Sequence, residues 1–114
     1  MRKILISIFF VSLLSTSFAH GEGATRTYGL GLKTCGWLLS NNDREIDKLL
    51  YMTYIGGYIS GANKIARANG GEDIGLEFDV LYDLAMKKCR DNPKNFFSSA
   101  LDGVIIDAWK SKKK

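Results

Sequence analysis

The two cysteines are the residues of this chain most suited to chemistry. Cys35 and Cys89 are the only cysteines among 114 residues. An even number of cysteines in a small exported chain predicts a disulfide. Two free thiols and a metal-binding pair are the alternatives. A metal pair needs further ligands, and the chain has a single histidine, His20. We therefore expect a Cys35–Cys89 disulfide and no metal site.

Other catalytic residue types form no familiar constellation. His20 lies in a glycine-rich segment, so no serine or cysteine nucleophile has a histidine base in the expected fold. Copper chelation by an amino-terminal His20 would need a second histidine or a similar ligand. The segment "GGEDIG" lacks both the lysine and the preceding strand of a phosphate-binding loop.

Two aspartate pairs have the spacing of one helical turn, namely Asp43 with Asp47 and Asp79 with Asp83. Paired carboxylates can do acid–base work. On amphipathic helices such pairs usually belong to the solvated face. We expect a protein that is not an enzyme and has no cofactor.

Residues 1–19 have the pattern of a signal peptide. A basic start precedes an apolar run over residues 4–14, and the small residues Ser17 and Ala19 precede His20. An uncleaved membrane anchor is the alternative, but the run is short for a bilayer span of about 20 residues. The pattern predicts a periplasmic protein with no stable membrane insertion after cleavage before His20.

The positive net charge belongs to the two ends of the chain. The sequence has 16 Lys and Arg against 12 Asp and Glu, but Arg2 and Lys3 lie in the signal peptide. Four of the last five residues are lysines, so residues 110–114 are expected to form a solvated basic tail. Acidic residues outnumber basic ones by two over residues 20–109. No basic face for nucleic acid is indicated, and we expect protein partners.

Apolar residues at helical spacing predict an all-α domain of four helices over residues 34–109. The glycine-rich residues 20–33 are expected to form a flexible arm. The expected helix starts are Thr34, Asn42 with Glu45 three residues later, the region of Phe78, and Asn92 followed by Pro93. Asn69 and the following glycines are expected to end the second helix.

Three stripes of apolar residues define the inward faces of the longer helices. The second helix is expected to bury Ile46, Leu50, Tyr54, Tyr58, Ala62 and Ile65, flanked by Leu49, Ile55 and Ile59. The third is expected to bury Phe78, Leu81, Tyr82, Ala85 and Cys89. The fourth is expected to bury Phe96, Phe97, Ala100, Leu101, Val104, Ile105 and Ala108.

The stretch "YIGGYISGAN" puts three glycines inside the second helix, where each costs about 1 kcal/mol relative to alanine. Gly57 and Gly61 lie one turn apart on the face of Tyr54 and Tyr58. The first interpretation is close packing inside the monomer, with Phe96 or Phe97 in the hollow. A groove or subunit interface, and a break into two helices, are the alternatives. Gly56 lies about 100° around the helix and is expected only to loosen it.

Three short motifs resemble the HdeA/HdeB family of small periplasmic acid-stress chaperones. They are "TCGWL" at 34–38, "KCRDNP" at 88–93, and Trp109 followed by a lysine-rich end. The resemblance implies an HdeA-like four-helix bundle stapled by one disulfide. It also implies that unfolded protein clients are held at low pH.

Charge gives this reading a physical basis. In strong acid the 12 carboxylates become neutral, so the side-chain charge of residues 20–114 rises from +2 to about +15. Repulsion would loosen helices or a dimer, while the disulfide would hold the chain together.

The stretch "GYISG" at 57–61 is similar instead to the Rap/Tai-type immunity proteins of type VI secretion. That resemblance implies one dedicated partner, a secreted toxin effector neutralised in the periplasm. A chaperone is the leading interpretation and an immunity or inhibitor protein the alternative. Both interpretations are compatible with a homodimer.

Overall fold

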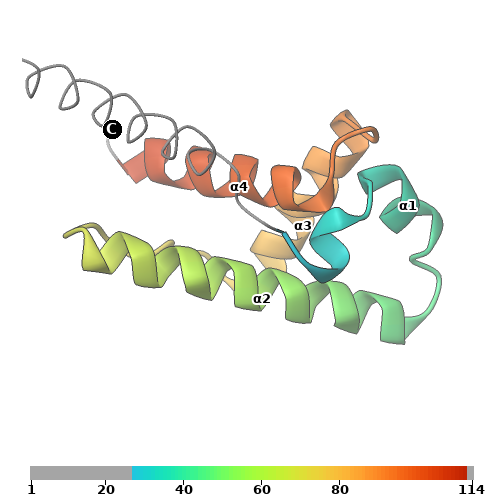
Figure 1. Cartoon of the computed structure of the whole chain (residues 1–114), viewed down its shortest axis with the longest axis horizontal. Coiled ribbons are helices and arrows are strands. Elements are labelled where there is room, and N and C mark those ends of the chain that lie inside the picture. The colour runs from blue at the N-terminus through green and yellow to red at the C-terminus, as the bar shows by residue number, and fades with distance from the viewer. Residues whose placement is uncertain (1–26, 113–114) are drawn as a thin grey trace, which may run out of the picture.

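The computed structural model describes residues 27–112 (Figure 1). Its elements are the 3-10 helix η1 (Gly29–Leu32) and the α-helices α1 (Cys35–Ser40), α2 (Glu45–Ala68), α3 (Phe78–Asp91) and α4 (Phe97–Lys112). No β-strand occurs within these residues, so the all-α, four-helix prediction is confirmed. The predicted signal peptide 1–19, residues 20–26 of the predicted arm with His20, and residues 113–114 lie outside the described part.

The two long helices α2 and α4 run side by side (Figure 1). Both begin at the end of the bundle where η1 and α1 lie, and α3 packs against α4, α1 and α2. Because α4 contacts every other element, it is the centre of the fold.

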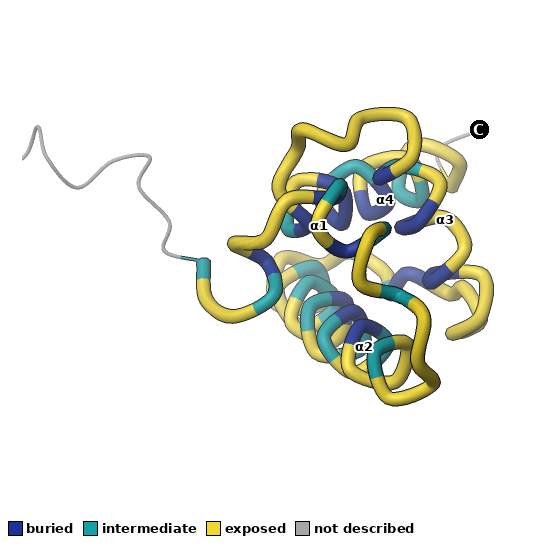
Figure 2. Tube along the Cα trace, turned by 90° about the vertical axis from the view of Figure 1, so that its right-hand side faces the viewer, coloured by how far each residue is buried: buried dark blue, intermediate teal, exposed yellow. Residues whose placement is uncertain are grey.

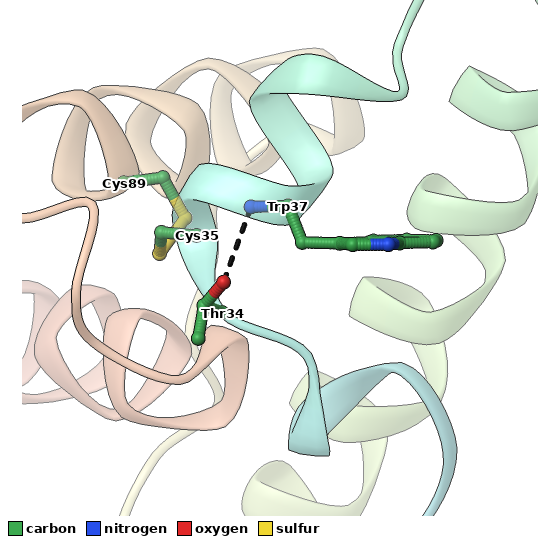
Figure 3. The surroundings of a disulfide bond; sticks show 4 residues. All are labelled: Thr34, Cys35, Trp37 and Cys89. Atoms are coloured by element: carbon green, nitrogen blue, oxygen red, sulfur yellow. Dashed lines mark hydrogen bonds between the residues drawn. A yellow bond between two sulfur atoms is a disulfide. The ribbon is translucent and has the colours of Figure 1, made fainter.

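The predicted disulfide is confirmed. Cys35 at the start of α1 and Cys89 near the end of α3 are bonded, with Cα atoms 4.8 Å apart, and neither is exposed to solvent. Thr34 caps α1 as expected, its hydroxyl accepting from the Trp37 amide at 3.2 Å (Figure 3). The Trp37 ring points away from the two sulfur atoms.

The prediction that Asn92 and Pro93 begin the last helix is wrong, because α4 begins at Phe97. The intervening carbonyl groups bond the start of α1 instead: the Cys35 amide donates to Asn95 and the Gly36 amide to Pro93, at 2.7 and 2.8 Å. Two of the amides that a helix start leaves without intrahelical partners are thus satisfied by the turn between α3 and α4.

The start of α2 also differs from the prediction. Arg44, not Asn42, is the N-cap residue, and the Asp47 carboxylate accepts from the Arg44 amide and pairs with its guanidinium group. At the other end Asn69 is the C-cap residue, as expected. Gly70 then has φ +78°, a conformation that favours glycine.

The buried face of α2 is rotated from the predicted stripe. Tyr51, Ile55 and Ile59 are buried, whereas Ile46, Leu50 and Ile65 are at least half exposed. The buried positions of α2 are confined to one side of the helix (Figure 2). The stripes of α3 and α4 are largely correct. The exceptions are Phe78 and Phe96, which are 43% and 52% exposed. Neighbouring Phe97 is fully buried in place of Phe96.

Both predicted tails are partly structured. Within the predicted arm, η1 packs on α4, and the Tyr54 hydroxyl donates to the Tyr28 carbonyl at 3.2 Å. Gly31 is buried, and a side chain there would collide with the Tyr54 hydroxyl. At the other end Lys110 and Lys112 belong to the last turn of α4. The predicted flexible arm is therefore too long, while residues 110–112 are exposed as expected but helical.

Candidate functional site

A continuous hollow follows the seam between α2 and α4. Three adjoining hollows of about 700, 590 and 600 Å³ compose it. The first two share Gly57, Tyr58 and Asp102, and the last two share Ile65 and Trp109. We call this hollow the α2–α4 groove. Its first two parts are lined mainly by Tyr54, Gly57, Tyr58, Gly61, Ala62, Ile65, Asp102, Ile105, Ile106 and Trp109. Beyond Ile65, the charged residues Glu72 and Lys112 line its far end.

The two glycines one turn apart lie on this groove and not in a packed joint. Within residues 27–112, no atom lies within 4 Å of a Cβ added at Gly57 or at Gly61. Close packing of these glycines inside the monomer is therefore wrong. A break in the element is wrong too, since α2 is one helix from Glu45 to Ala68. At these glycines the monomer has a groove, which was one of the alternatives.

Gly56 is the glycine that packs closely. A Cβ there would lie 3.0 Å from the outer carbon atoms of the Phe78 ring. The expectation that Gly56 only loosens the helix is therefore wrong. Phe97 fills space elsewhere, with its ring centroid 6.4 Å from that of Tyr51 and 5.7 Å from that of Tyr54.

The groove wall provided by α2 is free of charge. Leu49–Asn63 contains no Asp, Glu, Lys, Arg or His, although six of these 15 residues are exposed. A surface helix of a water-soluble protein normally has a charged or polar outer face. This uncharged run is a sequence signal for a contact surface. It is independent of the glycines, because it depends on the absence of charged residue types.

The apolar rims of the groove are open to solvent. Ile65 of α2 is 66% exposed and Ile106 of α4 is 48% exposed. Full burial of an exposed aliphatic side chain is worth about 1.5–3 kcal/mol, and a partner that covered these two would recover roughly half of that at each. The groove is therefore suited to an apolar segment.

One polar contact crosses the groove. The Tyr58 hydroxyl donates to Asp102 Oδ1 at 2.5 Å. Burial, followed by the nearby Asp102 carboxylate, raises the pKa of the Tyr58 hydroxyl above its usual range, so the hydroxyl remains a donor. Burial likewise raises the pKa of Tyr54, whose ring lies 6.0 Å from that of Tyr58. Sequence reasoning placed both tyrosines here and missed Asp102, which lies 44 positions from Tyr58.

The aspartate pairs and the segment "GGEDIG", considered as candidate catalytic or binding residues, do not form one site. Asp47 is engaged with Arg44, while Asp79 and Asp83 are exposed on α3. In the segment "GGEDIG", Asp73 pairs with Arg67 at 2.7 Å and Ile74 is buried in the core. Within residues 27–112 no group of three or more His, Cys, Asp and Glu is placed to hold a metal ion.

Comparison with protein-family models, curated proteins and solved structures finds no match to this chain. No helix within the described range is long and apolar enough to cross a lipid bilayer. The fold and the site therefore define the class: a small all-α protein with one buried disulfide and an apolar groove between two helices.

Proposed function

We propose that this chain is an exported, non-enzymatic protein that binds another protein in the α2–α4 groove, in the manner of an immunity or inhibitor protein with one dedicated partner. The observation that carries the proposal is the groove itself, whose α2 wall has no charge and whose two glycines face open space. Export is supported by the amino-terminal sequence pattern and by the disulfide, which is typical of oxidising compartments.

A dedicated partner is favoured over transient clients because the groove exists in the folded chain. Rigid walls reduce the ordering cost of binding. The Tyr54 and Tyr58 rings are held by contacts with Phe97 and by the bond to Asp102. A partly fixed aromatic surface of this kind suits one complementary segment better than many unrelated ones.

Gly57→Leu tests the proposal. The new side chain enters open space within the groove, so we expect the fold to remain and stoichiometric partner capture at neutral pH to be lost. Ser60→Leu is the matched control, since Ser60 is exposed on the same helix outside the groove. Circular dichroism checks the fold of both variants. Equal capture by wild type and Gly57→Leu, or no stoichiometric partner at all, would contradict the proposal.

An acid-activated chaperone is the second candidate. Three ion pairs have carboxylates that titrate in acid. Arg44–Asp47 lies at the start of α2, Arg67–Asp73 joins α2 to the loop that follows it, and Lys88–Asp107 joins α3 to α4. Hydrogen bonds from the basic partners lower the pKa of each carboxyl, so the pairs persist until strong acid and are then lost. The buried disulfide does not titrate and would hold the loosened chain together.

The chaperone candidate has a separate test. An aggregation-prone enzyme is taken to about pH 2.5, below the usual range of carboxyl pKa values, with and without the protein, and then neutralised. The chaperone candidate predicts that more of the enzyme stays soluble when the protein is present. Unchanged solubility would exclude it and leave the dedicated-partner proposal standing.

A further inference from the structure

We propose that the segment occupying the α2–α4 groove belongs to a different protein and carries one lysine or arginine among apolar residues, opposite Asp102. The inference rests on the proposed function and specifies the chemistry of the partner. It is carried by the position of Asp102 in the central hollow of the groove, whose other lining residues within 27–112 are uncharged.

Among residues 27–112, Asp102 is the only charged residue that lines the central hollow. The other eight lining residues there are Gly57, Tyr58, Gly61, Ala62, Ile65, Ile105, Ile106 and Trp109. Tyr58 donates to one carboxylate oxygen of Asp102 at 2.5 Å. The salt bridges formed within residues 27–112 do not include Asp102.

Covering the groove would remove this carboxylate from water. An ion that is buried without an opposite charge costs several kcal/mol, and one neutral hydrogen bond does not offset that cost. A partner that fills the hollow with apolar groups alone would therefore bind more weakly, because it would bury Asp102 without an opposite charge. A partner with one cation in register with Asp102 removes the penalty and gains a charge-assisted hydrogen bond.

A second copy of this chain fits the groove less well. In a symmetric dimer the α2 wall of the copy would face the groove, and Leu49–Asn63 of that wall contains no basic side chain. Laid in the groove, it would leave Asp102 without a cation. Charge complementarity therefore favours a different protein.

The groove also sets the length of the bound segment. From Tyr54 to Ile65 the α2 wall spans about 16 Å, or three turns of helix. Asp102 lies in both the first and the central hollow, away from the Ile65 end. A helix of three to four turns with apolar ends and one central cation would match this wall.

Synthetic helices test the inference. Three fluorescent amphipathic peptides of about 18 residues, five turns, differ only at one central position: arginine, norleucine or glutamate. Their affinities for the disulfide-bonded protein are measured by fluorescence anisotropy. The arginine peptide should bind about tenfold more tightly than the norleucine peptide, and the glutamate peptide more weakly than both.

Asp102→Asn should abolish this ranking. The amide can still accept from Tyr58 but carries no charge, so arginine and norleucine peptides should bind within about twofold of each other. Asp79→Asn, an exposed change on α3, should leave the tenfold preference intact.

The outcomes separate this inference from the function on which it rests. Peptides that bind without charge preference, and lose binding in Gly57→Leu, overturn the inference and keep the groove as a binding site. No binding of any peptide overturns the inference, and the proposed function then stands or falls on partner capture by wild type and Gly57→Leu. A concentration-dependent dimer that Gly57→Leu dissociates also overturns the inference, since a second copy would then cover the groove.

Discussion

Gly56, Gly57 and Gly61 share one helix but have different surroundings. Gly56 makes room for the Phe78 ring, whereas a Cβ at Gly57 or Gly61 would meet nothing within 4 Å. Gly57 and Gly61 therefore each lower the stability of the helix, and no contact within residues 27–112 offsets this loss. The proposed partner surface accounts for both.

Alanine substitution should separate the glycines by their effects on stability. Gly57→Ala and Gly61→Ala should each raise the free energy of unfolding by about 0.5–1 kcal/mol, because alanine favours the helix and meets no atom. Gly56→Ala should gain less, because the Phe78 ring must move. Urea denaturation measures all three. A loss of stability at Gly57 or Gly61 would show a hidden packing role.

At the residue scale, sequence patterns located the groove residues but not their arrangement. Helical spacing put Gly57, Gly61, Tyr54 and Tyr58 on one face correctly. The direction of that face depends on which side of α2 meets α3 and α4, and local spacing does not contain that information. Asp102 was missed for the same reason, since its contact with Tyr58 crosses between helices.

Helix boundaries in this fold are decided by contacts from other elements. Pro93 has the sequence features of a helix start, yet its carbonyl accepts from Gly36 of α1. Thr34 forms an isolated bridge with Phe96 next to this contact, and α4 begins only after it. Hydrogen bonds with the start of α1, about 60 residues away in the sequence, therefore prevail over the local capping pattern at Asn92 and Pro93.

The loop between α2 and α3 is fastened by a small polar cluster. Asp73 pairs with Arg67 of α2, and Lys112 of α4 donates to the Asp73 carbonyl. The hydrogen bond from Arg67, and then its charge together with that of Lys112, lowers the pKa of Asp73. Next to it, buried Ile74 is anchored by its amide, which donates to Asn63 at 2.8 Å.

This cluster should make the loop acid-sensitive. A carboxyl whose pKa is lower in the folded chain stabilises the fold above its unfolded pKa, and that contribution disappears as pH falls through the folded value. Asp73→Asn should therefore destabilise the protein at pH 6, with a difference that shrinks below about pH 4. Urea denaturation across this range measures it.

Asp79→Asn serves as control for the loop. Its carboxylate is exposed on α3 and belongs to none of the ion pairs found within residues 27–112. A difference between wild type and Asp73→Asn that is constant from pH 6 to strong acid would contradict a role for the charge.

For the whole molecule, the disulfide is the main covalent constraint. It joins α1 to α3 across 54 positions, and both cysteines are fully buried. Loop-closure entropy assigns such a link about 4 kcal/mol, a large share of the stability of a small domain. Its presence was predictable from the cysteine count, because few alternatives exist for two cysteines in a short chain.

Replacing both cysteines should therefore weaken the fold strongly. The double variant Cys35→Ala with Cys89→Ala should lose about 2–5 kcal/mol of unfolding free energy. Thermal or urea denaturation of the monomer measures the loss. A midpoint equal to that of the wild type would show that helix packing alone holds the bundle.

The most direct test of the groove as a protein-binding surface is site-specific photo-crosslinking in producing cells. A photoreactive residue at Ile106 lies on the groove rim, and one at Val80 of α3 is similarly exposed outside it. We predict one heterologous adduct at Ile106, lost on Gly57→Leu, and none at Val80. The crosslinked peptide should be apolar with one lysine or arginine. Equal adducts at both positions, or none at Ile106, would contradict the account.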